Sequence, residues 1–328
     1  MAHYVLGVDG GATKTLALVA DLAGTVVGCG RAGGSNLYGP SPEEAITNIA
    51  EAVTIAVRAA GIPPDSLVAG GFSLCGADWP EDFDFFHAEM TKRRFGRTVT
   101  IVNDAVGGLY AGSPDGFGVA VVCGTGSATA ARSPDGARWH ASFWQEPDGA
   151  VDLARRALRA VYRADLGLDQ PTSLTPRVLA HYNRENVENV LHLLTRRVDP
   201  SPMRISGLVR LLMEEADRDD PVARCIVEEH GTALGDCALA AARRVGIEGA
   251  AFTLVLAGGI FRHPSRLHAG ALIARVQTSS PEVLPLHSPF EPVVGALRIA
   301  LEVAGSTWDD TTRGHLTVSM PPRTLFET

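Results

Sequence analysis

Short apolar runs separated by glycine-containing turns dominate the first 30 residues. Apolar runs of this length between turn residues predict β-strands, here at 4–8, 15–21 and 25–28. Between residues 46 and 60, apolar positions recur mostly at spacings of three and four, which predicts an amphipathic helix that ends at Gly61. The rest of the first 115 residues predicts, in order, strand 67–74, helix 81–95, strand 98–102 and a short helix that opens at Asn103.

The pattern of the first segment begins again after residue 116. Strands are predicted at 117–123, 128–132 and 138–143, with a glycine turn between the first two. The glycine turns at Gly10 and Gly124 are 114 residues apart. Helices dominate from about 150 to 245, and a strand at 252–257 precedes a last helix, strand and helix. We interpret this pattern as an internal duplication of a mixed-sheet unit, whose two copies face each other across a cleft.

Composition narrows the class of protein. Of the 328 residues, 45% are apolar and 20% are charged, as in folded soluble proteins, and no apolar run is long enough to cross a membrane. The formal net charge of −8 gives no general attraction to nucleic acid or anionic lipid. The five cysteines are scattered without a CxxC pair, which argues against a disulfide framework, a zinc ribbon or an iron–sulfur site and predicts a cytoplasmic location.

The 35 glycines cluster just after apolar runs. The segment from Gly7 to Thr15 (GVDGGATKT) is not a P-loop, because Thr13 stands where a glycine should precede the lysine, and it is not a GxGxxG motif. A hairpin tip of small residues can still present backbone N–H groups to a phosphate, and Asp9 at the strand end is well placed to hold hydrated Mg²⁺. A plain structural hairpin is the alternative. The turn at 124–127 (GTGS) is a second glycine-containing hairpin tip of small residues. If the two hairpins face each other, they could bind a triphosphate from both sides.

Asn103 and Asp104 follow a predicted strand and open a helix. Both residue types are favoured N-caps, which is a purely structural role. A carboxylate at a helix N-terminus is also held ionised by the helix dipole, as a base that accepts a hydroxyl proton requires. The two interpretations are compatible if Asn103 caps the helix and Asp104 points into the cleft. Gly258-Gly259, after the apolar run LVLA, predicts either a strand-to-helix turn or a flat backbone platform for an adenine ring.

Five motifs occur in the order DGGATKT, SN, NDA, GTGS and AGG. In this order and spacing the sequence resembles the sugar-kinase branch of the actin and heat-shock-chaperone ATPase fold, and within it the N-acetylglucosamine kinase group of the BadF/BadG-type ATPases. The resemblance covers nearly the whole chain to about residue 304. It implies an α/β fold of two duplicated ribonuclease-H-like (actin-like ATPase) domains, with mixed sheets flanked by helices and a cleft between the lobes.

The resemblance also implies domain boundaries. The N-terminal ATPase domain would span residues 1–115 and the C-terminal one residues 116–290. A closing helix at about 291–304 would pack back on the N-terminal domain. Residues 306–328 are polar, contain prolines and lack periodicity, so we expect an appended tail there. Dimerisation is common among relatives, so a homodimer is compatible with the resemblance, although no residue of this sequence establishes it.

The same resemblance implies roles for individual residues. Asp104 would be the general base, and Asp9 would lie near Mg²⁺. Asn36 and Gly76, together with Asp104, would border the sugar. ATP would be bound by the two phosphate hairpins and by residues that flank the adenosine: Gly10, Gly11, Thr13, Lys14, Gly124, Thr125, Gly126, Ser127, Ala216, Gly258 and Gly259.

One segment departs from the family pattern. Members usually carry a GWG…GDEGS stretch whose aspartate binds the amino sugar, whereas residues 141–150 read ASFWQEPDGA, with Pro147 in the place of that aspartate. Glu146 or Asp148 would have to replace it. The implied activity is ATP-dependent phosphorylation of a hexose or hexosamine, with N-acetylglucosamine or a related amino sugar as the first candidate. The alternative, which the departure supports, is a nucleotide-binding ATPase switch or sensor without sugar kinase activity.

Overall fold

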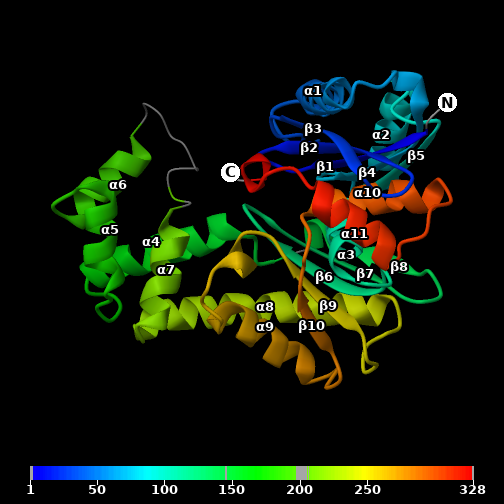
Figure 1. Ribbon diagram of the computed structural model, residues 1–328. Helices are drawn as coiled ribbons and strands as arrows, with labels where there is room; N and C mark the ends of the chain where they lie inside the picture. The colour runs from blue at the N-terminus through cyan, green and yellow to red at the C-terminus, as the bar shows by residue number, and fades with distance from the viewer. Residues whose placement is uncertain (1–2, 145, 197–204, 206, 327–328) are drawn as a thin grey trace.

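The computed structural model describes residues 3–144, 146–196, 205 and 207–326, and it contains two five-stranded mixed sheets flanked by helices (Figure 1). The first sheet has the order β3-β2-β1-β4-β5, with β1 (Tyr4–Gly10), β2 (Thr15–Asp21), β3 (Val26–Ala32), β4 (Leu67–Leu74) and β5 (Thr98–Asn103). The second has the order β10-β9-β6-β7-β8, with β6 (Gly118–Cys123), β7 (Ser127–Arg132), β8 (Arg138–His140), β9 (Thr253–Ala257) and β10 (Leu284–His287).

The two sheets repeat the same connections. β1 is antiparallel to β2 and parallel to β4, and β6 is antiparallel to β7 and parallel to β9. The tight turns follow equivalent pairs, Gly10–Thr15 and Cys123–Ser127. This repeat confirms the predicted α/β class with two duplicated lobes. The predicted strand 138–143 is too long, because the chain turns into a short 3₁₀ helix at η2 (Ser142–Trp144).

Helices cover both sheets. In the first lobe α1 (Pro42–Ala60) packs on β2 and β3, and α2 (Pro80–Lys92) packs on β5. The second lobe carries α4 (Ala150–Asp165), α5 (Leu174–Tyr182), α6 (Val187–Thr195), α7 (Leu208–Asp217), α8 (Pro221–Arg244) and α9 (Leu267–Gln277). No helix in the described part of the chain is both long enough and apolar enough to cross a membrane.

The sequence of α1 shows why this segment becomes a helix. Ser41 is the N-cap, and its side chain accepts a hydrogen bond from the N–H of Glu44. Ile46, Ile49 and Val53 share one buried face. Gly61 ends the helix with a φ of +64°, which glycine adopts at little cost. The helix begins earlier than the apolar spacing alone predicts, because its first turn is polar.

Two helices lie between the sheets, α3 (Asp104–Gly112) and α10 (Pro292–Val303) (Figure 1). α10 packs against β1 and β4, whereas α3 packs against β6 and against α10. The two helices cross in backbone contact, because a Cβ added at Gly295 would lie 1.9 Å from the carbonyl oxygen of Gly107. Only glycine at this crossing permits such close packing.

The C-terminal segment is more structured than the sequence analysis predicts. Residues expected to form an irregular tail contain α11 (Asp310–Ser319), capped by Asp309, and a 3₁₀ turn, η5 (Arg323–Leu325). Leu316 and Phe326 are buried in the same cluster as residues of β1 and β2. The periodicity is weak because α11 buries only Thr312 and Leu316, so its stability comes from the lobe on which it packs.

Candidate active site

The first glycine hairpin joins β1 to β2. The N–H of Gly11 donates to the carbonyl of Lys14 (3.0 Å), and the N–H of Ser35 donates to the carbonyl of Gly11 (2.9 Å). The buried Thr15 donates through its hydroxyl to that of Ser35 (2.7 Å). The structure therefore holds the predicted nucleotide-binding residues of this segment together at one braced turn: Gly10, Gly11, Thr13 and Lys14.

The second glycine hairpin joins β6 to β7 and rests on the start of α4. The N–H of Gly124 donates to the carbonyl of Gly126 (2.8 Å). The N–H of Ala150, the first residue of α4, donates to the carbonyl of Gly124 (2.8 Å). The carboxylate of Asp148 accepts a hydrogen bond from the N–H of Ser127 (3.1 Å). The second hairpin is therefore anchored by the segment that precedes α4.

Cys75 lies against the first hairpin, in an acidic environment. The N–H of Cys75 donates to the carbonyl of Gly10 in the first hairpin (2.8 Å). Burial raises the pKa of the Cys75 thiol, and four carboxylates raise it further: Asp104, Asp78, Asp9 and Asp148. Among these carboxylates, Asp9 stands beside the first hairpin and Asp148 is hydrogen-bonded to Ser127 of the second.

Asp104 occupies the first turn of α3, as the sequence analysis predicts. The side chain of Asn103 caps the helix by accepting a hydrogen bond from the N–H of Ala105 (3.1 Å), which confirms the structural interpretation of that residue. Burial raises the pKa of Asp104 to about 6, and the carboxylate of Asp78 raises it as well. A group with this pKa is mostly ionised at pH 7 yet basic enough to accept a proton, as a general base requires.

Asp9 stands at the end of β1, beside the first hairpin. Its pKa is raised to about 7, mainly by burial and also by the carboxylate of Asp104, while Lys14 partly offsets the effect. Among the described residues no group of three or more His, Cys, Asp or Glu side chains could hold a metal ion. Mg²⁺ in phosphoryl-transfer sites usually binds one or two carboxylates together with substrate phosphates and water. Asp9 fits that pattern, because a cation would relieve the repulsion between its carboxylate and that of Asp104.

Replacing Asp9 by Asn should stabilise the fold at pH 8. Folding raises the pKa of Asp9 from its ordinary value near 4 to about 7. Between about pH 4 and 7, therefore, Asp9 is protonated in the native state and ionised in the unfolded state. The free energy of unfolding of the wild type consequently falls as the pH rises through this window. The substitution removes this decrease in the free energy of unfolding, which amounts to a few kcal/mol at most. Urea unfolding at pH 6 and pH 8 measures it, with the exposed Asp65→Asn as control. Equal pH slopes for Asp9→Asn and wild type would contradict this explanation.

The predicted sugar-side residues lie together next to Asp104. The side chain of Asn36 accepts a hydrogen bond from the N–H of Tyr38 (3.1 Å). Gly76 has a φ of +83°, and a Cβ there would lie 3.1 Å from Oδ1 of Asn36. The amide of Asn103 donates to the carboxylate of Asp78 (2.8 Å), two residues beyond Gly76. This chain of contacts joins Asn36 and Gly76 to the start of α3.

An exposed aromatic cluster, formed by Tyr38, Trp79 and Phe143, borders these residues. The ring of Phe143 lies 5.2 Å from that of Tyr38 and 6.0 Å from that of Trp79, measured between ring centroids. The buried carboxylate of Asp82 holds Tyr38 and Trp79 in place, because it accepts hydrogen bonds from the Tyr38 hydroxyl and the Trp79 backbone N–H. Tyr38 and Trp79 belong to the first lobe and Phe143 to the second, so the cluster links the lobes. No local sequence pattern predicts this cluster.

Segment 141–150, which departs from the family pattern, supports the second hairpin. Oδ1 of Asp148 accepts hydrogen bonds from the N–H groups of both Ser127 and Gly149 (3.1 and 2.8 Å). The side chain of Glu146 is exposed, and its carbonyl accepts a hydrogen bond from the thiol of Cys237 (3.3 Å). The structure thus gives Asp148 a bracing role that the sequence analysis does not foresee. Sugar binding by Asp148 or Glu146 stays a prediction.

The predicted adenosine-side residues differ in their surroundings. Gly258 follows β9 with a φ of +99°, and a Cβ there would lie 2.4 Å from the carbonyl oxygen of Cys123. Apart from its chain neighbours, no atom of the described residues would lie within 4 Å of a Cβ at Gly259, so this backbone faces open space. The side chain of Ala216 is fully buried in the core of the second lobe, so it cannot itself touch a nucleotide.

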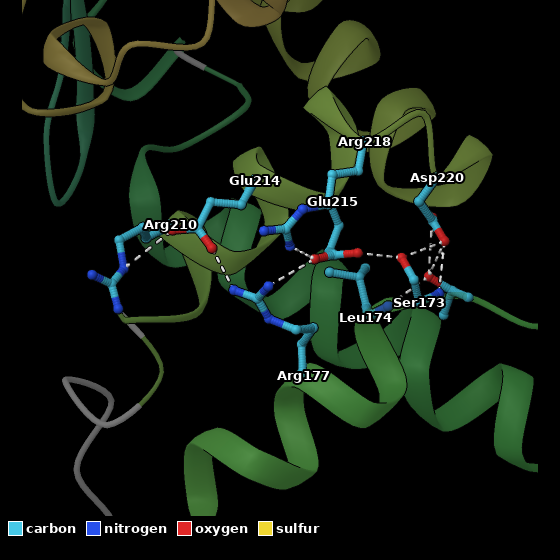
Figure 2. Close-up of polar contacts among 9 residues, drawn as sticks. Ser173, Leu174, Arg177, Arg210, Glu214, Glu215, Arg218 and Asp220 are labelled. Carbon is cyan, nitrogen blue, oxygen red and sulfur yellow. Dashed lines mark hydrogen bonds and ion pairs between the residues drawn. The ribbon is translucent and has the colours of Figure 1, made fainter.

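A polar network holds the chain where α7 leads into α8, next to Ala216 (Figure 2). The buried Glu215 pairs with Arg177 of α5 (3.1 Å) and with Arg218. Asp220, the N-cap of α8, accepts hydrogen bonds from the N–H and the hydroxyl of Ser173 (2.7 and 3.0 Å). Because the carboxylates of Glu215 and Asp220 are buried and paired, they fix the position of this turn in the second lobe.

Comparison with known proteins agrees with this arrangement. The sequence profile of the BadF/BadG/BcrA/BcrD ATPase family matches residues 6–300. The N-acetylmuramic acid/N-acetylglucosamine kinase of Clostridium acetobutylicum is 23% identical over 269 residues, which cover 81% of this chain and 88% of that protein. The N-acetyl-D-glucosamine kinase of Dictyostelium discoideum is 24% identical over 311 residues, which cover 90% of this chain and 97% of that protein.

A solved structure shows the same fold. A Chromobacterium violaceum protein provisionally named N-acetylglucosamine kinase matches with a TM-score of 0.67 at 23% identity, over 92% of this chain and 99% of that one. The profile match spans both hairpins, Asp104, α3 and most of α10. The chain belongs to the BadF/BadG/BcrA/BcrD ATPase family.

Proposed function

We propose that this protein is an ATP-dependent kinase of an amino sugar. The observation that carries the proposal is Asp104 itself. This carboxylate has a pKa of about 6, opens α3 and lies within electrostatic range of Asp78 and of Asp9 beside the first hairpin. Two backbone hairpins near such a base suit phosphoryl transfer, in which positioning and charge stabilisation supply most of the acceleration. Membership of an ATPase family supports the choice of nucleotide.

In the proposed mechanism the sugar hydroxyl attacks the γ-phosphorus of ATP in line with the leaving ADP oxygen. Asp104 accepts the hydroxyl proton as the new oxygen–phosphorus bond forms and the bond to ADP breaks. The hairpins bind the phosphates through backbone N–H groups, and Lys14 adds a positive charge. Mg²⁺ bound beside Asp9 would neutralise phosphate charge.

We propose N-acetylglucosamine or a related amino sugar as the acceptor. The two curated relatives described above are named for N-acetylmuramic acid and N-acetylglucosamine, and for N-acetyl-D-glucosamine. Pro147 removes the family's sugar-binding aspartate, so Glu146, Asp148 or the aromatic cluster would have to replace its contact. Mg²⁺ dependence, a cytoplasmic location, a homodimer and the absence of nucleic-acid partners stay predictions.

A coupled assay of ADP release with a panel of sugars tests the proposal. Glucose, glucosamine, N-acetylglucosamine and N-acetylmuramic acid would each be supplied with ATP and Mg²⁺. We expect turnover that depends on an amino sugar and a phosphorylated product by mass spectrometry. Tight ATP binding with no response to any sugar would favour the alternative, a nucleotide-dependent switch or sensor.

Replacing Asn36 by Ala should mainly weaken sugar binding. Loss of a side-chain hydrogen bond should raise the KM for the sugar about three- to tenfold, with a smaller effect on kcat. Asn36→Asp separates two causes, because it keeps the acceptor for the Tyr38 N–H but loses the amide donor. Steady-state kinetics over sugar concentration measures both variants, with Asn189→Ala on α6 as control. An unchanged KM for the sugar in Asn36→Ala would show that the Asn36 side chain does not contribute to sugar binding.

A further inference from the structure

A cavity of about 1040 Å³ lies where β9 and β10 end. Its walls come from three parts of the chain: the turn after β9, the start of α10 and the C-terminal segment. The lining residues used below are Gly258, Arg262, Glu291, Arg323 and Phe326. Gly258 and Arg262 belong to the second lobe, whereas Arg323 and Phe326 belong to the C-terminal segment that packs on the first.

This cavity adjoins both phosphate hairpins. On one side Gly258 is packed against the carbonyl of Cys123, the residue before the second hairpin. On the other side the carbonyl of Phe326 accepts a hydrogen bond from the ammonium group of Lys14 in the first hairpin. A ligand held by both hairpins would therefore have the C-terminal segment as a neighbour.

The C-terminal segment is fixed in this place by contacts along its length. Ser319, at the end of α11, accepts a hydrogen bond through its hydroxyl from the N–H of Val26 (2.8 Å). The guanidinium of Arg31 donates to the carbonyl of Leu325 (3.1 Å). The side chain of Phe326 is 7% exposed and packs in the core beneath the first sheet. Arg323 therefore projects from an anchored turn rather than from a free end.

Charge at the cavity is unbalanced in favour of cations. Glu291 pairs with Arg262. Burial lowers the pKa of Lys14, and among nearby charges Glu291 opposes this shift whereas Arg31 and Arg262 add to it. Arg323 is exposed, and the ion pairs of the described residues give it no carboxylate partner. Among the described charged residues that line the cavity, Arg262 and Arg323 thus face one carboxylate, that of Glu291, and this excess of positive charge suits an anionic ligand.

We infer that Arg323 binds the phosphate groups of the nucleotide, so that the C-terminal segment completes the nucleotide pocket. The inference rests on the proposed function for the identity of the nucleotide. It goes beyond the family, because the family profile ends at residue 300 and Arg323 lies outside it. Arginine suits this role because its planar guanidinium can make paired hydrogen bonds to phosphate oxygens.

Direct binding of ADP and of a non-hydrolysable ATP analogue, measured by calorimetry without sugar, tests the inference. Arg323→Ala should weaken binding of the analogue about tenfold or more, as expected for loss of a hydrogen bond to a charged group. Arg323→Lys should retain part of the affinity. Arg313→Ala is the matched control, because Arg313 lies in α11 and pairs with Asp310 away from the cavity. Thermal unfolding of each variant checks that the fold is intact.

The outcomes separate this inference from the proposed function. Wild-type affinity in Arg323→Ala would overturn the inference, and so would an equal loss in Arg313→Ala. Suppose that Arg323→Ala selectively loses nucleotide affinity but the wild type phosphorylates no sugar. This result would support nucleotide binding by Arg323 and overturn the proposed kinase activity. A wild-type chain that binds neither nucleotide would overturn both.

Discussion

Replacing Asp104 by Asn should lower kcat by about 10²- to 10⁴-fold, the usual contribution of general-base catalysis. Asn has nearly the shape of Asp and keeps an oxygen that can accept the hydrogen bond from the N–H of Ala105, so the first turn of α3 should persist. Nucleotide affinity should change little, because the substitution removes a proton acceptor rather than a phosphate contact. Steady-state kinetics and direct nucleotide binding measure the two effects.

The wild-type pH profile gives an independent check on the same residue. With a pKa of about 6, Asp104 becomes protonated as pH falls, so kcat/KM should decline below about pH 6 and approach a tenfold loss per pH unit. Asp84→Asn, an exposed position on α2, is the control and should keep wild-type kinetics. Near-normal turnover in Asp104→Asn, or a flat profile between pH 5 and 7, would exclude Asp104 as the base.

Two glycine-to-alanine substitutions at the same position of different helices should have opposite effects on stability. Gly295 and Gly270 are the fourth residues of α10 and α9. A Cβ at Gly295 would overlap the Gly107 carbonyl at 1.9 Å, whereas none of the surrounding atoms would lie within 4 Å of a Cβ at Gly270. We expect Gly295→Ala to destabilise the fold by about 3 kcal/mol or more, because two helix backbones must separate.

Gly270→Ala should instead stabilise the fold by about 0.5–1 kcal/mol, the usual gain when alanine replaces glycine in a helix. Urea unfolding curves for the two variants and the wild type measure the difference. Since both changes add the same methyl group at the same helix position, intrinsic helix propensity cancels between them. Equal free energies of unfolding in the two variants would mean that the close contact between α3 and α10 does not require glycine at position 295.

The two hairpins and the Asn103-Asp104 pair are predicted from the sequence because their signals are local. Glycine after an apolar run predicts a turn wherever it occurs, and an asparagine before a helix predicts a cap from a few neighbouring residues. The duplication makes these signals stronger, because the turn at Gly10 occurs again at Gly124. The family resemblance adds that each of the two domains contains a mixed sheet flanked by helices, and the structure confirms two equivalent mixed sheets.

Other parts of the site depend on contacts between residues far apart in sequence. Tyr38 and Phe143 meet only once both lobes have folded, and neither residue lies in a pattern that predicts an exposed aromatic contact. Asp148 is predicted as a sugar ligand because it lies in the segment that replaces the family motif. In the structure its carboxylate accepts a hydrogen bond from the second hairpin. Similarly, α11 has too few apolar residues for its period to be visible, and it is held by contacts such as that of Ser319 with Val26.

The placement of α10 and the C-terminal segment has a consequence for synthesis on the ribosome. Val5 of β1 and Leu18 of β2 share a hydrophobic cluster with Leu297, Leu316 and Phe326, which follow the second lobe in the sequence. Domains usually fold in order as they emerge during translation. Here the N-terminal lobe cannot bury that face of its sheet until Phe326 has left the exit tunnel, so its folding is completed only after the second lobe has been synthesised.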